Sequence, residues 1–172
     1  MGKYLNPGNE AFAISVNDDI YVDKTDMLSY INSRIGKKKR YLCVSRPRRF
    51  GKSTTAEMLS AYYSRGCDSQ KLFQDRKIAS DQQYISHLNH YDVIFLNMQH
   101  LLSSAKTPTN LIAHLEHELL TDLQNAYPFV KKENISHLPD VFCWQISPGK
   151  HQTHFSVRSS RYSSASPCHT QC

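Results

Sequence analysis

The sequence predicts an α/β fold, a three-layer sandwich in which a parallel sheet lies between two layers of helices. Residues 41–65 fit a short apolar strand, a tight loop and a helix. Residues 91–98 contain an unbroken apolar run, which is typical of a parallel strand buried on both faces. A long amphipathic helix over residues 107–127 supplies a covering layer, because leucines recur along it every four residues.

The length and composition fit one globular domain. The chain has 172 residues, and 40% of them are hydrophobic. It has no apolar run of membrane-spanning length and no signal-sequence pattern, so we expect a cytoplasmic protein without a membrane partner. Five widely spaced cysteines do not predict a disulfide framework. The net charge of +6 favours an anionic partner.

The N-terminal part of the chain predicts a strand followed by a helix. Residues 20–22 form the strand candidate, and Asp23 or Thr25 can cap the helix. The buried face of this helix is expected to comprise Met27, Leu28, Ile31 and Ile35. Asp23 and Lys24 could lie near a ligand, although capping and a surface charge are the simpler interpretations. A basic loop over residues 36–40 ends the helix.

Residues 45–54 carry the pattern around which the chain is organised. They read Ser-Arg-Pro-Arg-Arg-Phe-Gly-Lys-Ser-Thr and match the end of the phosphate-binding loop G-x-x-x-x-G-K-S/T. In such a loop, N–H groups at the helix start bind phosphate oxygens, the lysine faces the β- and γ-phosphates, and the serine hydroxyl binds Mg²⁺. Arg46 stands where the full pattern has glycine, and Pro47 has no N–H to donate.

The loop closely resembles the variant Walker A loop "RPRRFGKS" of the bacterial AAA-ATPase-like family, whose members often carry a C-terminal PD-(D/E)XK nuclease-like domain. Residues 21–25 are similar to the family's "YVDKT" element, and residues 92–97 are similar to its next strand. The resemblance implies a P-loop NTPase domain over residues 1–140 that binds ATP and Mg²⁺. The residues expected at the nucleotide are Arg46, Arg48, Arg49, Phe50, Gly51, Lys52, Ser53 and Thr54, with Ser53 as the metal ligand.

Residues 141–172 do not continue this pattern. Residues 145–172 contain no Asp, Glu or Leu, so we expect a disordered, divergent tail. In the family, this region leads into a strand that ends in an acidic pair, which binds Mg²⁺ and activates water. The chain is therefore expected to be a truncated, C-terminally incomplete fragment that lacks the Walker B part. The strand over 91–98 ends in Asn97, a poorer ligand for a hard cation, so we expect nucleotide binding with poor hydrolysis and name no catalytic residue.

Other functions stay open at this point. The Arg and Lys clusters could form a nucleic-acid-binding module, or the chain could be a non-functional gene fragment. The sequence does not indicate an oligomer. Tail side chains could bind zinc, although their spacing matches no compact zinc module: Cys143, His151, His154, Cys168, His169 and Cys172. On the long helix, a solvated face is the better interpretation of His114, Glu116, His117 and Glu118.

Overall fold

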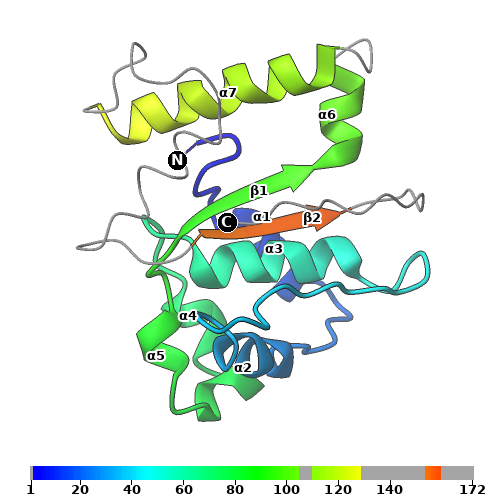
Figure 1. The fold of residues 1–172 in the computed structure, drawn as a ribbon. Coiled ribbons are helices and arrows are strands. Elements are labelled where there is room, and N and C mark those ends of the chain that lie inside the picture. The colour runs from blue at the N-terminus through cyan, green and yellow to red at the C-terminus, as the bar shows by residue number, and fades with distance from the viewer. Residues whose placement is uncertain (1, 105–109, 129–153, 160–172) are drawn as a thin grey trace.

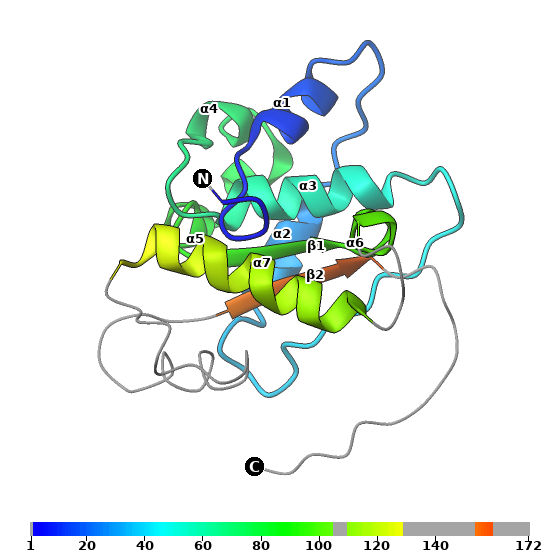
Figure 2. The same ribbon diagram turned by 90° about the horizontal axis from the view of Figure 1, so that it is seen from above.

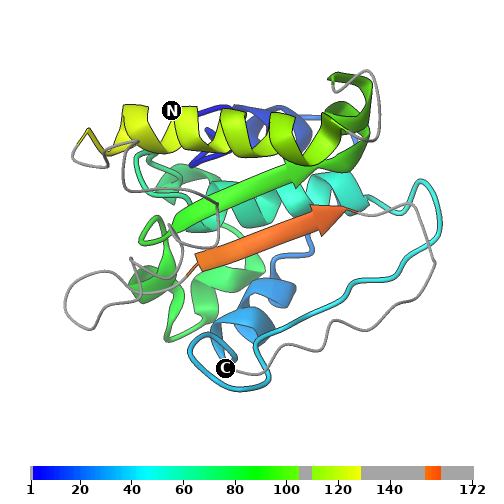
Figure 3. The same cartoon turned by 45° about the horizontal axis from the view of Figure 1, so that its top comes forward.

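The computed structural model describes residues 2–104 and 110–128, together with the backbone of 154–159 (Figure 1). The elements, in chain order, are α1 (Glu10–Val16), α2 (Asp26–Asn32), α3 (Lys52–Tyr63), α4 (Gln70–Phe73), η1 (Lys77–Ser80), α5 (Tyr84–His87), β1 (Asp92–Asn97), α6 (Met98–Ser104), α7 (Leu111–Ala126) and β2 (His154–Ser159). The architecture is therefore mixed helix and strand, as the sequence predicts. Helices lie on both sides of the two strands, with α7 on one side and α3 on the other (Figures 1 and 3).

The two strands pair in parallel. Their register runs from Asp92 opposite His154 to Asn97 opposite Ser159 (Figure 3). The sheet of a three-layer sandwich has more strands than the two described here. The three-layer sandwich therefore stays a prediction. β2 lies within residues 141–172, where a disordered tail is expected. The rest of that segment is outside the described residues, so the boundary at residue 140 also stays a prediction.

The strand expected at the start of residues 41–65 does not form, and this prediction was wrong. Residues 41–44 have no strand structure, and Tyr41 is 83% exposed. Among the described residues, no backbone hydrogen bond joins residues 41–44 to another segment, and β1 pairs with other parts of the chain. β2 pairs along one edge, while on the other the N–H of Asn6 donates to the carbonyl of Val93 at 2.8 Å and the N–H of Phe95 donates to Tyr4 at 2.9 Å. Residues 20–22 likewise form no strand.

β1 is buried on both faces, as its apolar run predicts. Val93 is fully buried in a core cluster with residues of α2, α3 and α4. Ile94, the next residue, belongs to a second cluster with Leu101 of α6 and Leu119 of α7. Successive side chains of a strand point to opposite faces, so β1 separates two cores and anchors each of them.

α3 contributes more residues than any other helix to the core that contains Val93. Four residues of this helix are 0–5% exposed: Met58, Leu59, Tyr62 and Tyr63. Tyr63 donates to the Asn32 side chain at 2.6 Å, and Tyr62 donates to the carbonyl of Tyr84 at 2.8 Å. These bonds satisfy the buried hydroxyls, so the C-terminal half of α3 is fixed against α2 and α5.

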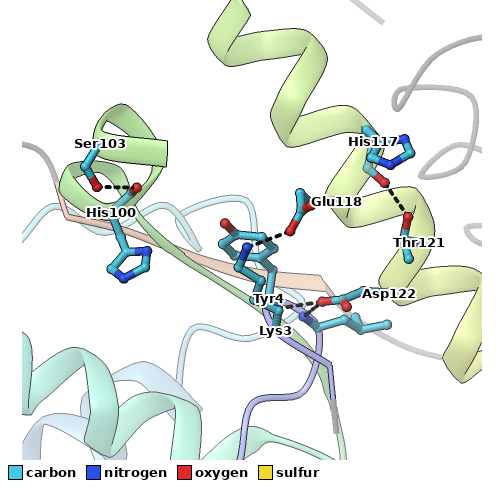
Figure 4. Close-up of polar contacts among 9 residues, drawn as sticks. Lys3, Tyr4, His100, Ser103, His117, Glu118, Thr121 and Asp122 are labelled. Carbon is cyan, nitrogen blue, oxygen red and sulfur yellow. Dashed lines mark hydrogen bonds and ion pairs between the residues drawn. The ribbon is translucent and has the colours of Figure 1, made fainter. Parts of the chain in front are cut away.

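The N-terminal segment is tied to α7 by a buried carboxylate (Figure 4). Asp122 accepts hydrogen bonds from the N–H groups of Tyr4 at 2.6 Å and Leu5 at 3.1 Å. One turn earlier on α7, Glu118 pairs with Lys3 at 2.6 Å. These contacts hold the segment that pairs with β1, so α7 supports the central strand through it.

The structure describes most of the predicted long helix as α7. The expected opening at residues 107–108 lies outside the described residues. None of the helices that the structure describes has both the length and the apolar character needed to cross a membrane.

Candidate functional site

The start of α3 leaves three backbone donors without a partner. Gly51 precedes the helix in the left-handed region, at φ 69° and ψ 31°, and no side chain caps the helix. The first helical bond runs from the N–H of Thr55 to the carbonyl of Gly51 at 2.9 Å. Within the described residues, the N–H groups of Lys52, Ser53 and Thr54 therefore have no acceptor. A helix of 12 residues with free N–H groups and no acid in its first turn favours an anion at this end.

Lys52 lies over the loop that precedes α3. Its ammonium group donates to the carbonyl oxygens of Arg46 at 2.5 Å and Pro47 at 2.9 Å. The arginine side chains of this loop are exposed: Arg46, Arg48 and Arg49. No acidic side chain of the described residues pairs with any of these four cations. The loop thus concentrates positive charge beside the free N–H groups of α3.

The side chains after Lys52 differ in accessibility. The Ser53 hydroxyl is on an exposed residue, whereas Thr54 is half-buried beside a cavity. An exposed hydroxyl in the first turn of the helix, next to a lysine, fits the oxygen ligand that Mg²⁺ takes in phosphate loops. Metal ligation by Ser53 stays a prediction.

Lys24 brings a second ammonium group to this loop. The segment between α1 and α2 lies beside the start of α3 (Figures 1 and 2), and the Lys24 Nζ atom donates to the carbonyl of Phe50 at 3.0 Å. A Cβ atom on Gly51 would lie only 2.8 Å from that Nζ atom. Glycine at position 51 therefore permits both the positive φ and the approach of Lys24.

The neighbours of Lys24 have a structural role instead. Asp23 accepts hydrogen bonds from the N–H groups of Thr25 at 2.9 Å and Lys77 at 3.0 Å. The Thr25 hydroxyl accepts from the N–H of Ile78 at 3.2 Å. Partial burial alone would raise the pKa of Asp23, but these N–H donors outweigh it and hold the pKa below its usual value. Asp23 and Thr25 thus attach the start of α2 to η1.

A cavity of about 480 Å³ opens beside the phosphate-type loop. It lies between α1, the segment after α1, and the first turns of α3. Its polar lining includes Asp18, Lys24 and Thr54. Its apolar lining comprises Phe12, Ile20, Tyr21, Val22, Phe50 and Met58.

At the end of β1, the described residues form no metal-ligand cluster. The Asn97 side chain accepts hydrogen bonds from the N–H groups of Gln99 at 3.1 Å and His100 at 3.3 Å, so it caps α6. Among the residues that the structure describes, no three His, Cys, Asp or Glu side chains lie close enough to share a metal ion. The cysteines and histidines of the tail lie outside the described side chains, so their zinc hypothesis stays untested.

Four of the predicted site residues line the cavity beside the phosphate-type loop: Arg49, Phe50, Gly51 and Thr54. The other four lie in the same loop or first turn of α3 but do not line it: Arg46, Arg48, Lys52 and Ser53. Sequence reasoning missed the cavity and its lining by Phe12 and Asp18. It favoured a plain surface charge for Lys24, although the "YVDKT"-like motif was a usable signal for that residue.

One comparison with known proteins gives a match. A family model described as "Predicted AAA-ATPase", for the AAA-ATPase-like family, matches residues 9–163. The match runs past residue 140, where the sequence analysis places the start of a divergent tail. No curated protein and no solved structure matches the chain.

Proposed function

This chain belongs to the AAA-ATPase-like family, and we propose on that premise that it binds Mg²⁺-ATP with the phosphates at the start of α3. One observation carries the proposal. Three N–H groups of a 12-residue helix have no acceptor among the described residues, and the same short segment carries Lys52 and three exposed arginines. Backbone donors and cations within one short segment suit a polyphosphate better than a single carboxylate.

Each residue of the loop has a separate task in this proposal. The N–H groups of 52–54 bind phosphate oxygens, and the Lys52 ammonium neutralises the β- and γ-phosphates. The Ser53 hydroxyl is the protein ligand of Mg²⁺, which bridges the phosphates and reduces their charge when bound. Arg46, Arg48, Arg49 and Phe50 surround the triphosphate, and Gly51 lets the main chain approach it.

Calorimetric titration of Mg²⁺-ATP into wild type and Lys52→Ala tests this function. Removing the ammonium should weaken binding by about tenfold or more, because hydrogen bonds to charged groups are worth roughly 1.5–3 kcal/mol. Lys39→Ala is the matched control, since Lys39 is an exposed lysine outside the phosphate loop. Equal affinities for wild type and Lys52→Ala would remove the phosphate-loop assignment.

A second candidate function is nucleic-acid binding by the basic segment before the phosphate loop. A cavity of about 370 Å³ is lined by Ser33, Arg34, Lys37, Lys38 and Lys39. Two exposed tyrosines lie under guanidinium groups, at 4.2 Å for Arg34 over Tyr30 and 5.1 Å for Arg40 over Tyr41. Cations combined with exposed aromatic rings suit a single strand, which binds through phosphates and base stacking.

Fluorescence anisotropy with a single-stranded oligonucleotide checks the second candidate. Affinity should fall steeply between about 50 and 200 mM salt, because each phosphate contact releases counterions. The combined Lys37→Ser, Lys38→Ser and Lys39→Ser variant should bind more weakly and with a shallower salt dependence. Unchanged affinity in this variant would reject the candidate.

A further inference from the structure

The basic cavity after α2 is built by a turn of the chain. Gly36 adopts the left-handed region at φ 75°, and the N–H of Lys37 donates to the carbonyl of Arg34 at 3.0 Å. The Arg34 guanidinium group donates to the carbonyl of Lys39 at 3.4 Å. These two bonds fold residues 34–39 back on themselves. Their cations therefore line one cavity instead of following an extended chain.

The positive charge of this cavity is not balanced by acidic groups. Residues 27–56 contain no Asp or Glu. None of the ion pairs among the described residues involves Arg34 or residues 37–39. The Nε–H group of Arg34 is buried and has no acceptor within the described part of the chain. The cavity therefore offers cations and a free hydrogen-bond donor to an anionic ligand.

Such a concentration of cations suits a phosphate monoester better than a phosphodiester. A monoester carries about −1.5 to −2 charges at pH 7 and has three strong acceptor oxygens. A phosphodiester within a strand carries only one charge, and an extended row of cations is enough to bind successive diesters. In a nucleic acid, a phosphate monoester occurs only at the end of a strand.

An aromatic ring beside the cavity can bind the base of a terminal nucleotide. The Arg34 guanidinium group lies 4.2 Å from the centroid of the Tyr30 ring, and Tyr30 is 51% exposed. Nucleobases stack on aromatic rings and on guanidinium planes. The cavity volume of about 370 Å³ is within the range of roughly 300–1,000 Å³ that is usual for small-molecule pockets. The cavity thus has room for more than a phosphate group.

We propose that this cavity binds the end of a single nucleic-acid strand that carries a terminal phosphate monoester. The proposal rests on the second candidate function, nucleic-acid binding, and adds a preference to it. The monoester lies among Arg34 and the lysines of residues 37–39, and the terminal base stacks beside Tyr30. The phosphate loop before α3 is not needed for this preference, because none of its residues lines the cavity.

Fluorescence anisotropy tests the preference with three single strands of one sequence. The strands carry a phosphate at the 5′ end, at the 3′ end or at neither end, and the dye is attached in the middle. Wild type should bind one of the phosphorylated strands about tenfold more tightly than the unphosphorylated strand, because the monoester gains charge-assisted hydrogen bonds. The arm with the higher affinity identifies the end that the cavity takes.

Two variants connect the preference to the cavity. Arg34→Lys should reduce the affinity ratio of phosphorylated to unphosphorylated strand, because an ammonium group cannot replace the planar donor fork of arginine. Lys71→Ser is the matched control and should keep the ratio, since Lys71 is an exposed lysine of α4 that does not line the cavity. A phosphoserine peptide should bind more weakly than the preferred strand, because it has no base to stack.

The outcomes separate this inference from the candidate function on which it rests. Equal binding of all three strands by wild type would overturn the terminal-phosphate cavity and leave nucleic-acid binding in place. An unchanged ratio in Arg34→Lys would also overturn it, because the phosphate would then bind elsewhere. A phosphoserine peptide that binds as tightly as the preferred strand would show that the base contributes nothing, which contradicts the proposal. Binding of no strand would reject the candidate function and the inference together.

Discussion

Lys24 and Gly51 illustrate how single residues shape the candidate site. In the "YVDKT"-like segment, Asp23 and Thr25 bind the backbone of η1, whereas Lys24 donates to the Phe50 carbonyl in the loop before α3. Three neighbouring residues thus face different parts of the molecule. Gly51 completes the arrangement because a side chain there would meet both backbone strain and the Lys24 ammonium.

His87 should make the stability of the fold depend on pH. The side chain is half-buried and shares a hydrogen bond with the Tyr91 hydroxyl. Burial lowers its pKa below the ordinary value of 6.5, and His90 adds to the effect while Asp81 opposes it. A lowered pKa means that the unfolded state takes up the proton first, so the His87 contribution is complete above about pH 6.5 and is lost as the pH falls.

The measurement for His87 is the melting temperature at about pH 7.5 and pH 5.5, on either side of the ordinary histidine pKa. Wild type should lose more stability over this interval than His87→Gln, which cannot titrate. The same pH dependence in both proteins would show that other groups cause it.

At the scale of elements, Asp122 connects α7 to the strand-like N-terminal segment. Asp122→Ala leaves the N–H groups of Tyr4 and Leu5 without their acceptor in a buried position. An unsatisfied buried donor costs about 1–3 kcal/mol, so we expect a melting temperature lower by several degrees. Glu118→Ala is the control, because it removes only a solvent-exposed ion pair on the same helix. Equal losses in the two variants would contradict the role given to Asp122.

The elements that could be predicted are those determined by a pattern of residues close together in the sequence. Leu28 and Ile31 of α2 are buried as helical spacing predicts, whereas Met27 and Ile35 are only half-buried. The strand β1 follows from its apolar run. The predicted strand at residues 41–44 failed because a strand needs a pairing partner, and β1 pairs instead with segments distant in the chain. Asp122 was missed for the same reason, since the donors that justify its burial are 117 and 118 residues away.

For the candidate site, too, residues that are consecutive in the sequence could be predicted, whereas residues that only packing brings together could not. The loop motif pointed to Gly51, Lys52 and Ser53, because phosphate binding needs these residue types in consecutive order. The cavity could not be predicted in this way. It forms between α1, residues 18–24 and α3, and only the packing of these segments brings Phe12, Asp18 and Lys24 beside the loop.

For the whole molecule, the site lies where ligand binding is expected in α/β folds. The carboxyl ends of β1 and β2 lie on the same side of the molecule as the start of α3 (Figures 1 and 3). Ligands of parallel sheets bind outside the carboxyl ends of the strands. The net charge of +6 favours the approach of an anionic ligand.

The whole chain should bind nucleotide yet hydrolyse it slowly. Hydrolysis needs groups that anchor Mg²⁺ and orient water in addition to the loop lysine. Asn97, at the end of β1, instead caps α6, and no metal-ligand cluster lies among the described residues. Steady-state phosphate release should therefore stay well below about 1 per second, the low end of ordinary enzyme turnover. Turnover at or above that rate, abolished by Lys52→Ala, would reveal a catalytic acid that this account does not include.

The central claim is that the start of α3 binds the phosphates, and backbone amide NMR tests it most directly. Titration of ¹⁵N-labelled protein with Mg²⁺-ATP should shift the amide signals of Gly51, Lys52, Ser53 and Thr54 more than those of other residues, because their N–H groups gain an anionic acceptor. Inorganic tripolyphosphate should shift the same amides, because it carries the same kind of anionic acceptors. Saturating ATP binding that leaves the amides of 51–54 unmoved would contradict the account.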